Sequence, residues 1–402
     1  MVMRRVRIVL LVSFASIAVV LCALVTSSAP AAEIPGAYIV TLRSGDPSAA
    51  ADDARRRHGA DVAHVYRHAV RGYAARMSAR AAAALRRQQD VASVIADRTV
   101  SATAQSLPTG VNRIDGELSS TRAGDGTGSV NVDVAVIDTG IDVTHPDLAV
   151  AGGKNCSTGS SYNDGNGHGS HVAGTIGAKD DANGVVGVAP GARLWAVRVL
   201  NNAGSGSWSS VICGIDWVTA NAGTIEVANM SLGGSGSDTG CKDGGLHQAI
   251  CNSVASGVTY AVAAGNESDD AKNHVPAAYD EVMTVSALAD FNGTPGGGGA
   301  PTCRSDQDDT FADFSNFGAD IDLIAPGVCI LSTWKRGGYN TISGTSMATP
   351  HVTGAAALYK ASNASASPAQ VKAALQSAGN LNWSNADDRD GTKERLLNVD
   401  VF

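Results

Sequence analysis

Apolar runs of strand length that alternate with helix-length segments constrain this chain most. The runs lie at 132–137, 194–200, 225–231 and 258–264, and the segments typical of helices between the later runs lie at 208–221 and 244–256. Strands buried on both faces of a parallel sheet have this continuous apolar character, and a crossover helix is needed to join them. The order predicts an α/β fold, a doubly wound, mostly parallel sheet with helices on both faces.

Three motifs supply a carboxylate, an imidazole and a hydroxyl in that chain order. They are Asp138-Thr139-Gly140, His168-Gly169-Ser170-His171 and Gly344-Thr345-Ser346-Met347-Ala348. Asp138 ends the first apolar run, and active sites of open α/β sheets lie at the carboxyl ends of strands. A serine becomes a good nucleophile when a histidine takes its proton and a buried carboxylate holds that histidine. We therefore expect Asp138, His168 and Ser346 to be catalytic.

Two neighbouring features extend this expectation. Proline is tolerated in the first turn of a helix, so Pro350 indicates that Ser346 lies near a helix N-terminus, whose positive end would stabilise developing negative charge. Asn266 follows the run 258–264, and an asparagine amide at a strand end can donate a hydrogen bond to an oxyanion. The loss of one such donor costs roughly 2.7–4 kcal/mol of transition-state stabilisation.

On these motifs the chain resembles the subtilisin family of serine proteases, and within it the proteinase K-like branch. The matching stretches are 134–140, 168–175, 196–200, 228–234, 261–266, 314–318 and 343–352. The resemblance implies Ser346 as nucleophile, His168 as general base and then acid, and Asp138 as the carboxylate that orients His168. It also implies an oxyanion hole made by the side chain of Asn266 and the backbone N–H of Ser346.

The resemblance further implies how a substrate binds. An extended peptide would be clamped as an added strand between two segment edges, where main-chain hydrogen bonds give affinity. The edges are Gly204, Ser205 and Gly206 on one side and Ser231, Leu232 and Gly233 on the other. The expected activity is that of a serine endopeptidase of broad specificity, which cleaves peptide bonds through an acyl-enzyme. One departure is Ser170, where the family usually has threonine.

Three rival functions remain to be weighed. A dedicated processing protease of narrow specificity would need acidic side chains in its pockets to bind basic residues. An esterase of the α/β-hydrolase type would need Gly-x-Ser-x-Gly, and Ser346 is followed by Met347-Ala348. A secreted pseudoenzyme that acts as a binding module would have lost a member of the triad or Asn266, and none is lost. The processing protease is therefore the serious alternative.

Residues 1–32 have the pattern of a secretory signal. Arg4, Arg5 and Arg7 precede an apolar stretch from Ile8 to Val25, and small residues follow as far as Ala32. The stretch is long enough for a membrane anchor, but the small residues favour cleavage. We expect a secreted, extracellular protein without membrane association after removal of the signal.

Residues 33–106 predict a separate small unit. Strands at 38–42, within 62–77 and at 91–99, with helices at 48–58 and 79–89, give the β-α-β-β-α-β order of ferredoxin-like α+β folds. The unit resembles the propeptide of the same protease family, which assists folding and inhibits the enzyme, although an unrelated small domain would also fit. We expect residues 107–402 to form the catalytic domain and the precursor to cut itself between about Thr99 and Pro108.

The charge of the two units supports their pairing. Residues 33–106 hold 11 Lys/Arg and 7 Asp/Glu, whereas residues 107–402 hold 16 Lys/Arg and 31 Asp/Glu. Opposite net charges favour docking of the propeptide as an intramolecular inhibitor. The acidic catalytic part argues against nucleic acid or an anionic membrane as a partner and for solubility. We expect a monomer that acts on protein and peptide substrates.

Cysteines and aspartates suggest what stabilises the fold. The six cysteines after the signal predict three disulfides with 15 possible pairings. Our preferred pairing joins Cys241 to Cys251 and Cys303 to Cys329, which leaves Cys156 for Cys213. Calcium is the expected cofactor, because hard cations take clustered carboxylate and carbonyl oxygens. The resemblance maps its site onto the carbonyls of Asp280 and Val282 and the carboxylate of Asp322, although a solvated acidic face is nearly as good an interpretation.

Overall fold

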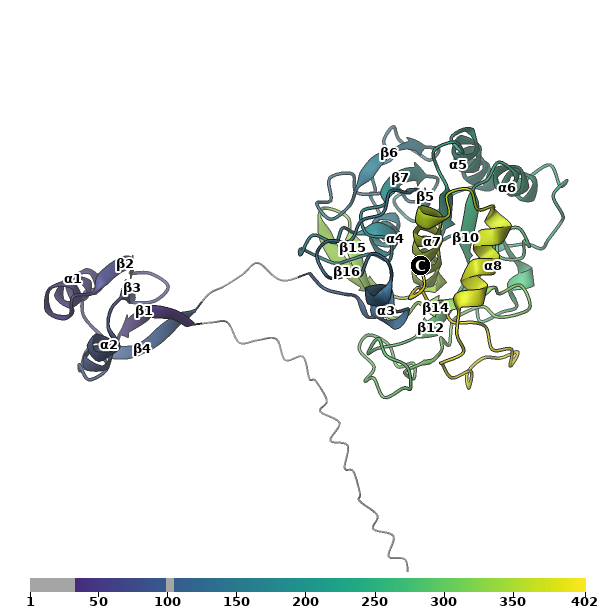
Figure 1. Cartoon of the computed structure of the whole chain (residues 1–402). Coiled ribbons are helices and arrows are strands. Elements are labelled where there is room, and N and C mark those ends of the chain that lie inside the picture. The colour runs from purple at the N-terminus through teal and green to yellow at the C-terminus, as the bar shows by residue number, and fades with distance from the viewer. Residues whose placement is uncertain (1–32, 99–104) are drawn as a thin grey trace, which may run out of the picture. The chain divides into compact units, whose positions relative to one another are not determined.

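The computed structural model describes residues 33–98 and 105–402, in two compact units divided between Ser101 and Ala102 (Figure 1). The expected signal at 1–32 lies outside the described residues. Gln105 and Ser106 donate their backbone N–H groups to the carbonyls of Ala182 and Gly184, at 3.2 and 2.8 Å. These two residues therefore belong with the second unit, although we expected the catalytic domain to begin at residue 107.

The first unit is a four-stranded antiparallel sheet with two helices. Its elements are β1 (Glu33–Leu42), α1 (Pro47–His58), β2 (Asp61–Tyr66), β3 (Gly72–Arg76), α2 (Ala79–Leu85) and β4 (Val91–Arg98). The strand order is β2-β3-β1-β4. The side chains of Asp46 and Ser78 cap the two helices, and residues such as Val40, Tyr73 and Leu85 form the core. The ferredoxin-like expectation is confirmed.

The second unit alternates strands and helices. Its main elements are β5 (Asp133–Asp138), β6 (Val150–Asn155), α4 (His168–Gly177), β7 (Arg193–Arg198), α5 (Trp208–Ala220), β8 (Val227–Met230), α6 (Leu246–Ala255), β10 (Thr259–Ala263), β12 (Met283–Ala289), β13 (Thr310–Phe311), β14 (Leu323–Pro326), α7 (Thr345–Ser362) and α8 (Pro368–Ala378). The remaining elements are α3 (Thr109–Arg113), η1 (Gly116–Leu118), β9 (Gly234–Ser235), η2 (Ala271–Asn273), β11 (His274–Val275), β15 (Ile330–Trp334) and β16 (Gly338–Ile342).

The central sheet of the second unit is parallel except at one edge. Its order is β13-β12-β10-β8-β5-β7-β6, with β14 also paired to β12, and within the described residues only β13 runs antiparallel. β5, which carries Asp138 at its carboxyl end, lies inside the sheet between β7 and β8. The doubly wound, mostly parallel sheet is therefore confirmed.

Both faces of this sheet are buried under helices. Along β5, Val134 and Val136 pack into one apolar cluster with α4, α7 and α8, whereas Ala135 and Ile137 pack into a second cluster with α5 and α6. Figure 1 shows α5 and α6 next to each other and α7 at the centre of the unit. Burying one such aliphatic side chain contributes about 1.5–3 kcal/mol, so the strand that presents Asp138 is held firmly.

Three disulfides join parts of the second unit. They are Cys156–Cys213, Cys241–Cys251 and Cys303–Cys329, the pairing that we preferred from the sequence. The first ties the end of β6 to α5, and the second ties the loop before α6 to that helix. In the part of the chain that the structure describes, no helix is both long and apolar enough to cross a membrane.

Candidate active site

Asp138 and His168 form a hydrogen-bonded pair. Asp138 is the last residue of β5 and is fully buried, and His168 is the first residue of α4. The imidazole Nδ1 lies 2.8 and 2.9 Å from the two carboxylate oxygens. Burial lowers the pKa of His168, but the charge and the hydrogen bond of Asp138 outweigh it, so the pKa is raised above its usual 6.5. With Nδ1 held by the carboxylate, Nε2 is the nitrogen that can accept a proton.

A buried aspartate that the sequence did not single out positions this pair. Asp164 Oδ1 accepts a hydrogen bond from Thr139 Oγ1 (2.9 Å), and Oδ2 accepts one from Ser170 Oγ (2.7 Å). Asp164 therefore links the end of β5 to the first turn of α4. A Cβ added to Gly169 would lie 2.1 Å from the carbonyl oxygen of Gly140, so this close approach requires glycine. Asp164 lies in the Gly/Asn-rich loop before His168, and that loop was the sequence feature that could have pointed to it.

Ser346 is the second residue of α7, near the helix N-terminus. Its hydroxyl donates to the carbonyl oxygen of Ser231 at 3.3 Å, and within the described residues no hydrogen bond joins it to His168. Pro350 lies inside the helix rather than in its first turn, which corrects our expectation. Because proline has no N–H to bond the Ser346 carbonyl four residues earlier, that oxygen is left for Ser231 Oγ, which donates to it at 2.8 Å.

Asn266 presents its amide in a defined orientation. Its Oδ1 accepts hydrogen bonds from the backbone N–H (2.8 Å) and the hydroxyl (3.1 Å) of Thr345. Because an oxygen must accept these bonds, the Nδ2 group points away from Thr345 and is available to another acceptor. Thr345 is thus a positioning residue that the sequence analysis missed, and it lies directly before Ser346.

The expected substrate segments line one cleft with His168. This cavity of about 670 Å³ is bordered by Gly204, Ser205, Gly206, Ser231, Leu232, Gly233, Leu200, Trp208 and Val211, among others. A second cavity of about 210 Å³ shares Leu232 and Gly233 and is bordered by Asn266, Ser346, Glu267 and His274. The shared residues Leu232 and Gly233 make the two cavities neighbours, one bordered by His168 and the other by Ser346. The apolar lining by Leu200, Trp208 and Val211 was not foreseen.

The oxygens that we expected to bind calcium converge on a lysine instead. Lys372 Nζ, from α8, donates to the carbonyls of Asp280 (3.1 Å) and Val282 (2.8 Å) and lies 2.8 Å from Asp322 Oδ1. Gln376 Nε2 also donates to that carboxylate oxygen, at 3.0 Å. An ammonium group occupies the place of a cation and supplies its charge, so the assignment of calcium to Asp280, Val282 and Asp322 is wrong for this structure.

The role of Lys372 predicts a measurable loss of stability. Hydrogen bonds that involve a charged group contribute about 1.5–3 kcal/mol, so Lys372→Met should lower the free energy of unfolding by that order. We expect this loss in urea denaturation, with or without chelator. Lys242→Met, at an exposed lysine, serves as the control. Equal midpoints for wild type and Lys372→Met would contradict the bonding role of Lys372.

Two buried oxygens elsewhere in the second unit lack hydrogen-bond partners. Gln105 Oε1 and Asp147 Oδ1 are buried without a hydrogen-bond partner. Both residues contact the same segment, because Gln105 Nε2 donates to the carbonyl of Val185 (3.1 Å) and Asp147 Oδ2 accepts from its N–H (2.9 Å). Burial raises the pKa of Asp147. Unpartnered amide and carboxylate oxygens suit a hard cation.

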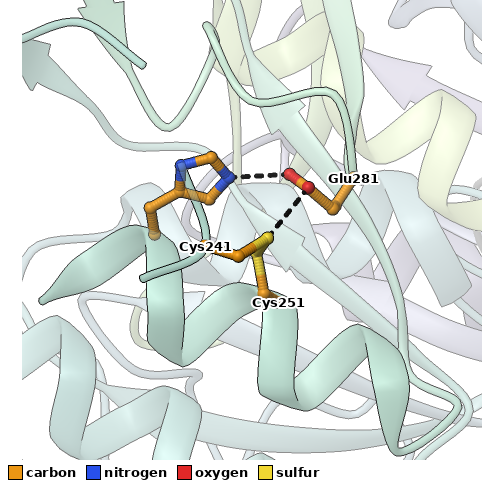
Figure 2. A group of neighbouring side chains, drawn as sticks. Cys241, Cys251 and Glu281 are labelled. Carbon is orange, nitrogen blue, oxygen red and sulfur yellow. Dashed lines mark hydrogen bonds and ion pairs between the residues drawn. A yellow bond between two sulfur atoms is a disulfide. The ribbon is translucent and has the colours of Figure 1, made fainter. Parts of the chain in front are cut away.

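A histidine and a disulfide gather elsewhere, beside α6. Figure 2 shows Glu281 facing the disulfide Cys241–Cys251. His247 belongs to the same group. His247 Nε2 lies 2.7 Å from Glu281 Oε2, and its Nδ1 lies 2.9 Å from Asp238 Oδ1. The sulfurs are bonded to each other and both ring nitrogens face carboxylates, so this cluster is a structural link and offers no thiolate to a metal.

Family comparisons agree with both units. The sequence model described as Subtilase family matches residues 129–395, and that described as Peptidase inhibitor I9 matches residues 37–103. The first match falls on the second unit and the other on the small N-terminal unit.

Individual relatives match over most of their length. Subtilisin DY of Bacillus licheniformis is 40% identical over 302 residues, which is 74% of this chain and 99% of that protein. Subtilisin E of Bacillus subtilis is 38% identical over 348 residues, 85% of this chain and 84% of that protein. A solved cold-adapted subtilisin-like serine proteinase, 36% identical, gives a TM-score of 0.56 and covers 76% of this chain and 93% of that one. None of these matches distinguishes the proteinase K-like branch, which stays a prediction.

Proposed function

The chain belongs to the subtilase family and is a serine endopeptidase with an inhibitor-family propeptide, and from this premise we propose that Asp138, His168 and Ser346 cleave peptide bonds in a secreted enzyme. The observation that carries the proposal is the pair of the buried Asp138 with His168, whose imidazole borders the same cleft as the two substrate segments. Chain order and family membership support the same three residues.

The proposed reaction proceeds through an acyl-enzyme. Ser346 Oγ turns from the Ser231 carbonyl to His168 Nε2, which takes its proton as the oxygen attacks the substrate carbonyl. Asn266 Nδ2 and the Ser346 N–H stabilise the oxyanion, and the α7 N-terminus adds a favourable field. The protonated His168, stabilised by Asp138, then protonates the leaving amine. Water then attacks the acyl carbonyl as His168 takes its proton, the ester bond to Ser346 Oγ breaks, and His168 returns the proton to that oxygen.

The pockets favour broad specificity over the narrow alternative. Glu267, at the smaller cavity, is the kind of acidic residue that a specificity for basic side chains would need. Its Oε2 already accepts hydrogen bonds from the Asn266 N–H (2.8 Å) and Asn316 Nδ2 (3.0 Å). The larger cavity has apolar side chains, Leu200, Trp208 and Val211, which suit many hydrophobic residues.

We propose a structural calcium at Gln105 and Asp147 as the cofactor of this enzyme.

The pH dependence of the reaction follows from the role of His168. The base must be neutral, and its pKa is raised above 6.5 by Asp138, so kcat/KM should fall as pH drops through a midpoint above 6.5 and level off at higher pH. A pH profile of peptide hydrolysis by the mature enzyme measures this. A rate that stays flat down to about pH 4 would point to a different base.

Self-processing tests the proposed precursor. Gln105 bonds to the catalytic unit, so the mature chain should begin at or before it, after a cut that follows Thr99. N-terminal sequencing of the secreted wild-type protein should find this start, and a Ser346→Ala precursor made in the same host should stay uncut. Secreted active protein that begins near Glu33, or normal processing of the Ser346→Ala precursor, would contradict self-cleavage.

A further inference from the structure

Three carboxylates gather in the segment that follows α8. This segment is separate in the sequence from the residues proposed for catalysis. Asp388, Asp390 and Glu394 each offer an oxygen atom, and these atoms lie within 4.8 Å of one another. Asp388 and Glu394 are only 9% and 6% exposed, whereas Asp390 is exposed. Two carboxylates of the cluster are therefore buried, and the third, that of Asp390, is accessible to solvent.

The buried carboxylates lack the partners that such groups normally have. Both oxygens of Asp388 and both oxygens of Glu394 are buried, and none of the four has a hydrogen-bond partner of good geometry. Burial is the main cause that raises the pKa of Asp388 to about 6 and that of Glu394 to about 8. A buried polar group without a partner costs free energy, and a buried carboxylate costs more, so native proteins keep few of them.

The positive residues of the same segment are engaged elsewhere. Arg389 Nη1 donates to the carbonyl of Ser268 (3.1 Å), and Arg395 Nη1 donates to that of Gly379 (2.6 Å). Lys393 Nζ lies over the ring of Trp383, 5.5 Å from its centroid. Among residues 33–98 and 105–402, no lysine or arginine forms an ion pair with Asp388, Asp390 or Glu394. In the described structure, the basic side chains of this segment therefore do not neutralise its three acidic groups.

We propose that Asp388, Asp390 and Glu394 bind a hard divalent cation, with calcium as the fitting ion. The cluster offers only oxygen atoms, and Ca²⁺ takes carboxylate oxygens at 2.3–2.6 Å in flexible geometry, whereas Mg²⁺ prefers to keep several waters. Gly391, at φ 73°, turns the chain between Asp390 and Glu394 so that both reach one point. Thr392 N–H fixes one oxygen of Asp390 (2.7 Å) and leaves the other for the cation. This proposal does not depend on the proposed catalytic function.

A neighbouring tryptophan provides a direct readout of binding. Trp383 is buried, and its Nε1 donates to the backbone carbonyl of Glu394 at 2.9 Å. Terbium ions bind calcium sites and emit when a nearby indole is excited. Mature protein inactivated with a sulfonyl fluoride and freed of metal by chelation should show this emission when titrated with Tb³⁺, and Ca²⁺ should displace it.

Two variants and one matched control locate the site. Asp388→Asn and Glu394→Gln should each weaken Tb³⁺ and Ca²⁺ binding about tenfold or more, because affinity at such sites depends on ligand charge. Asp387→Asn removes the same charge from an exposed neighbour outside the cluster and should leave affinity unchanged. None of the three variants changes Gln105 or Asp147, so any Tb³⁺ emission from the calcium site proposed there should persist in all of them. Unchanged calcium affinity in both cluster variants would overturn the proposal.

Thermal unfolding separates a lost site from a damaged fold. In excess chelator, Glu394→Gln should melt no lower than wild type, because the carboxyl group that it replaces is buried and has no hydrogen-bond partner to lose. Saturating calcium should raise the Tm of wild type and of Asp387→Asn, and should raise that of Glu394→Gln by clearly less. A calcium-induced rise in Glu394→Gln as large as that of wild type would show that the ion binds elsewhere.

Discussion

Replacing Ser346 with alanine should lower kcat for peptide hydrolysis about a million-fold, the loss measured when the nucleophile of subtilisin is removed. The alanine has no oxygen to attack the substrate carbonyl, and the remaining activity would come from the oxyanion hole and binding. The fold should persist, because the Ser346 hydroxyl makes a single bond of 3.3 Å to the Ser231 carbonyl. The measurement is turnover of a chromogenic peptide by the variant, supplied with its mature N-terminus.

An exposed serine in the same helix is the matched control. Ser362 lies at the opposite end of α7 from Ser346, so Ser362→Ala makes the same chemical change away from the cleft. This control should keep wild-type turnover and processing. If Ser346→Ala keeps wild-type turnover, or if Ser362→Ala loses it to the same extent, Ser346 is not the nucleophile.

The second large effect is expected at Asp138. Asp138→Asn should lower kcat about ten-thousand-fold, because an amide next to Nδ1 favours the wrong tautomer of His168 and cannot stabilise its protonated form. Asp138 also raises the pKa of His168, so the residual activity should have its acid limb at lower pH than wild type. That shift distinguishes loss of the carboxylate from a general weakening of the site.

A second buried aspartate controls for the loss of a charge. Asp142 Oδ2 accepts a hydrogen bond from the Gly337 N–H at 2.9 Å, and Asp142 makes no bond to His168. Asp142→Asn should lower the Tm while keeping kcat within a small factor of wild type. A comparable loss of kcat in both variants would indicate that the effect is structural rather than chemical.

The sequence predicted those features that depend on neighbouring residues. The apolar run that ends in Asp138 became β5, and its position inside a parallel sheet follows from alternation with helices. The order of elements in the first unit was likewise apparent from local patterns. Boundaries shifted by a few residues, as with Gln105 and Ser106, because long-range hydrogen bonds rather than local propensity fix where a unit begins.

Features that depend on distant residues were not predictable in this way. Lys372 lies 92 and 90 residues from Asp280 and Val282, and an exposed-looking lysine in an amphipathic helix gives no signal of its partners. The orientation of Asn266 likewise depends on Thr345, 79 residues away. Pro350 could enter the second turn of α7 because Ser231, from another part of the chain, bonds the carbonyl that it leaves free.

Covalent labelling tests the central claim most directly. A fluorophosphonate reacts with a serine only when a base activates its hydroxyl, so reaction of the mature enzyme followed by peptide mass mapping identifies the nucleophile. The proposed triad predicts one phosphonylated residue, Ser346, with complete loss of hydrolysis at one label per molecule and much slower labelling of Asp138→Asn. A label on another residue that abolishes hydrolysis, or full activity after stoichiometric labelling of Ser346, would contradict it.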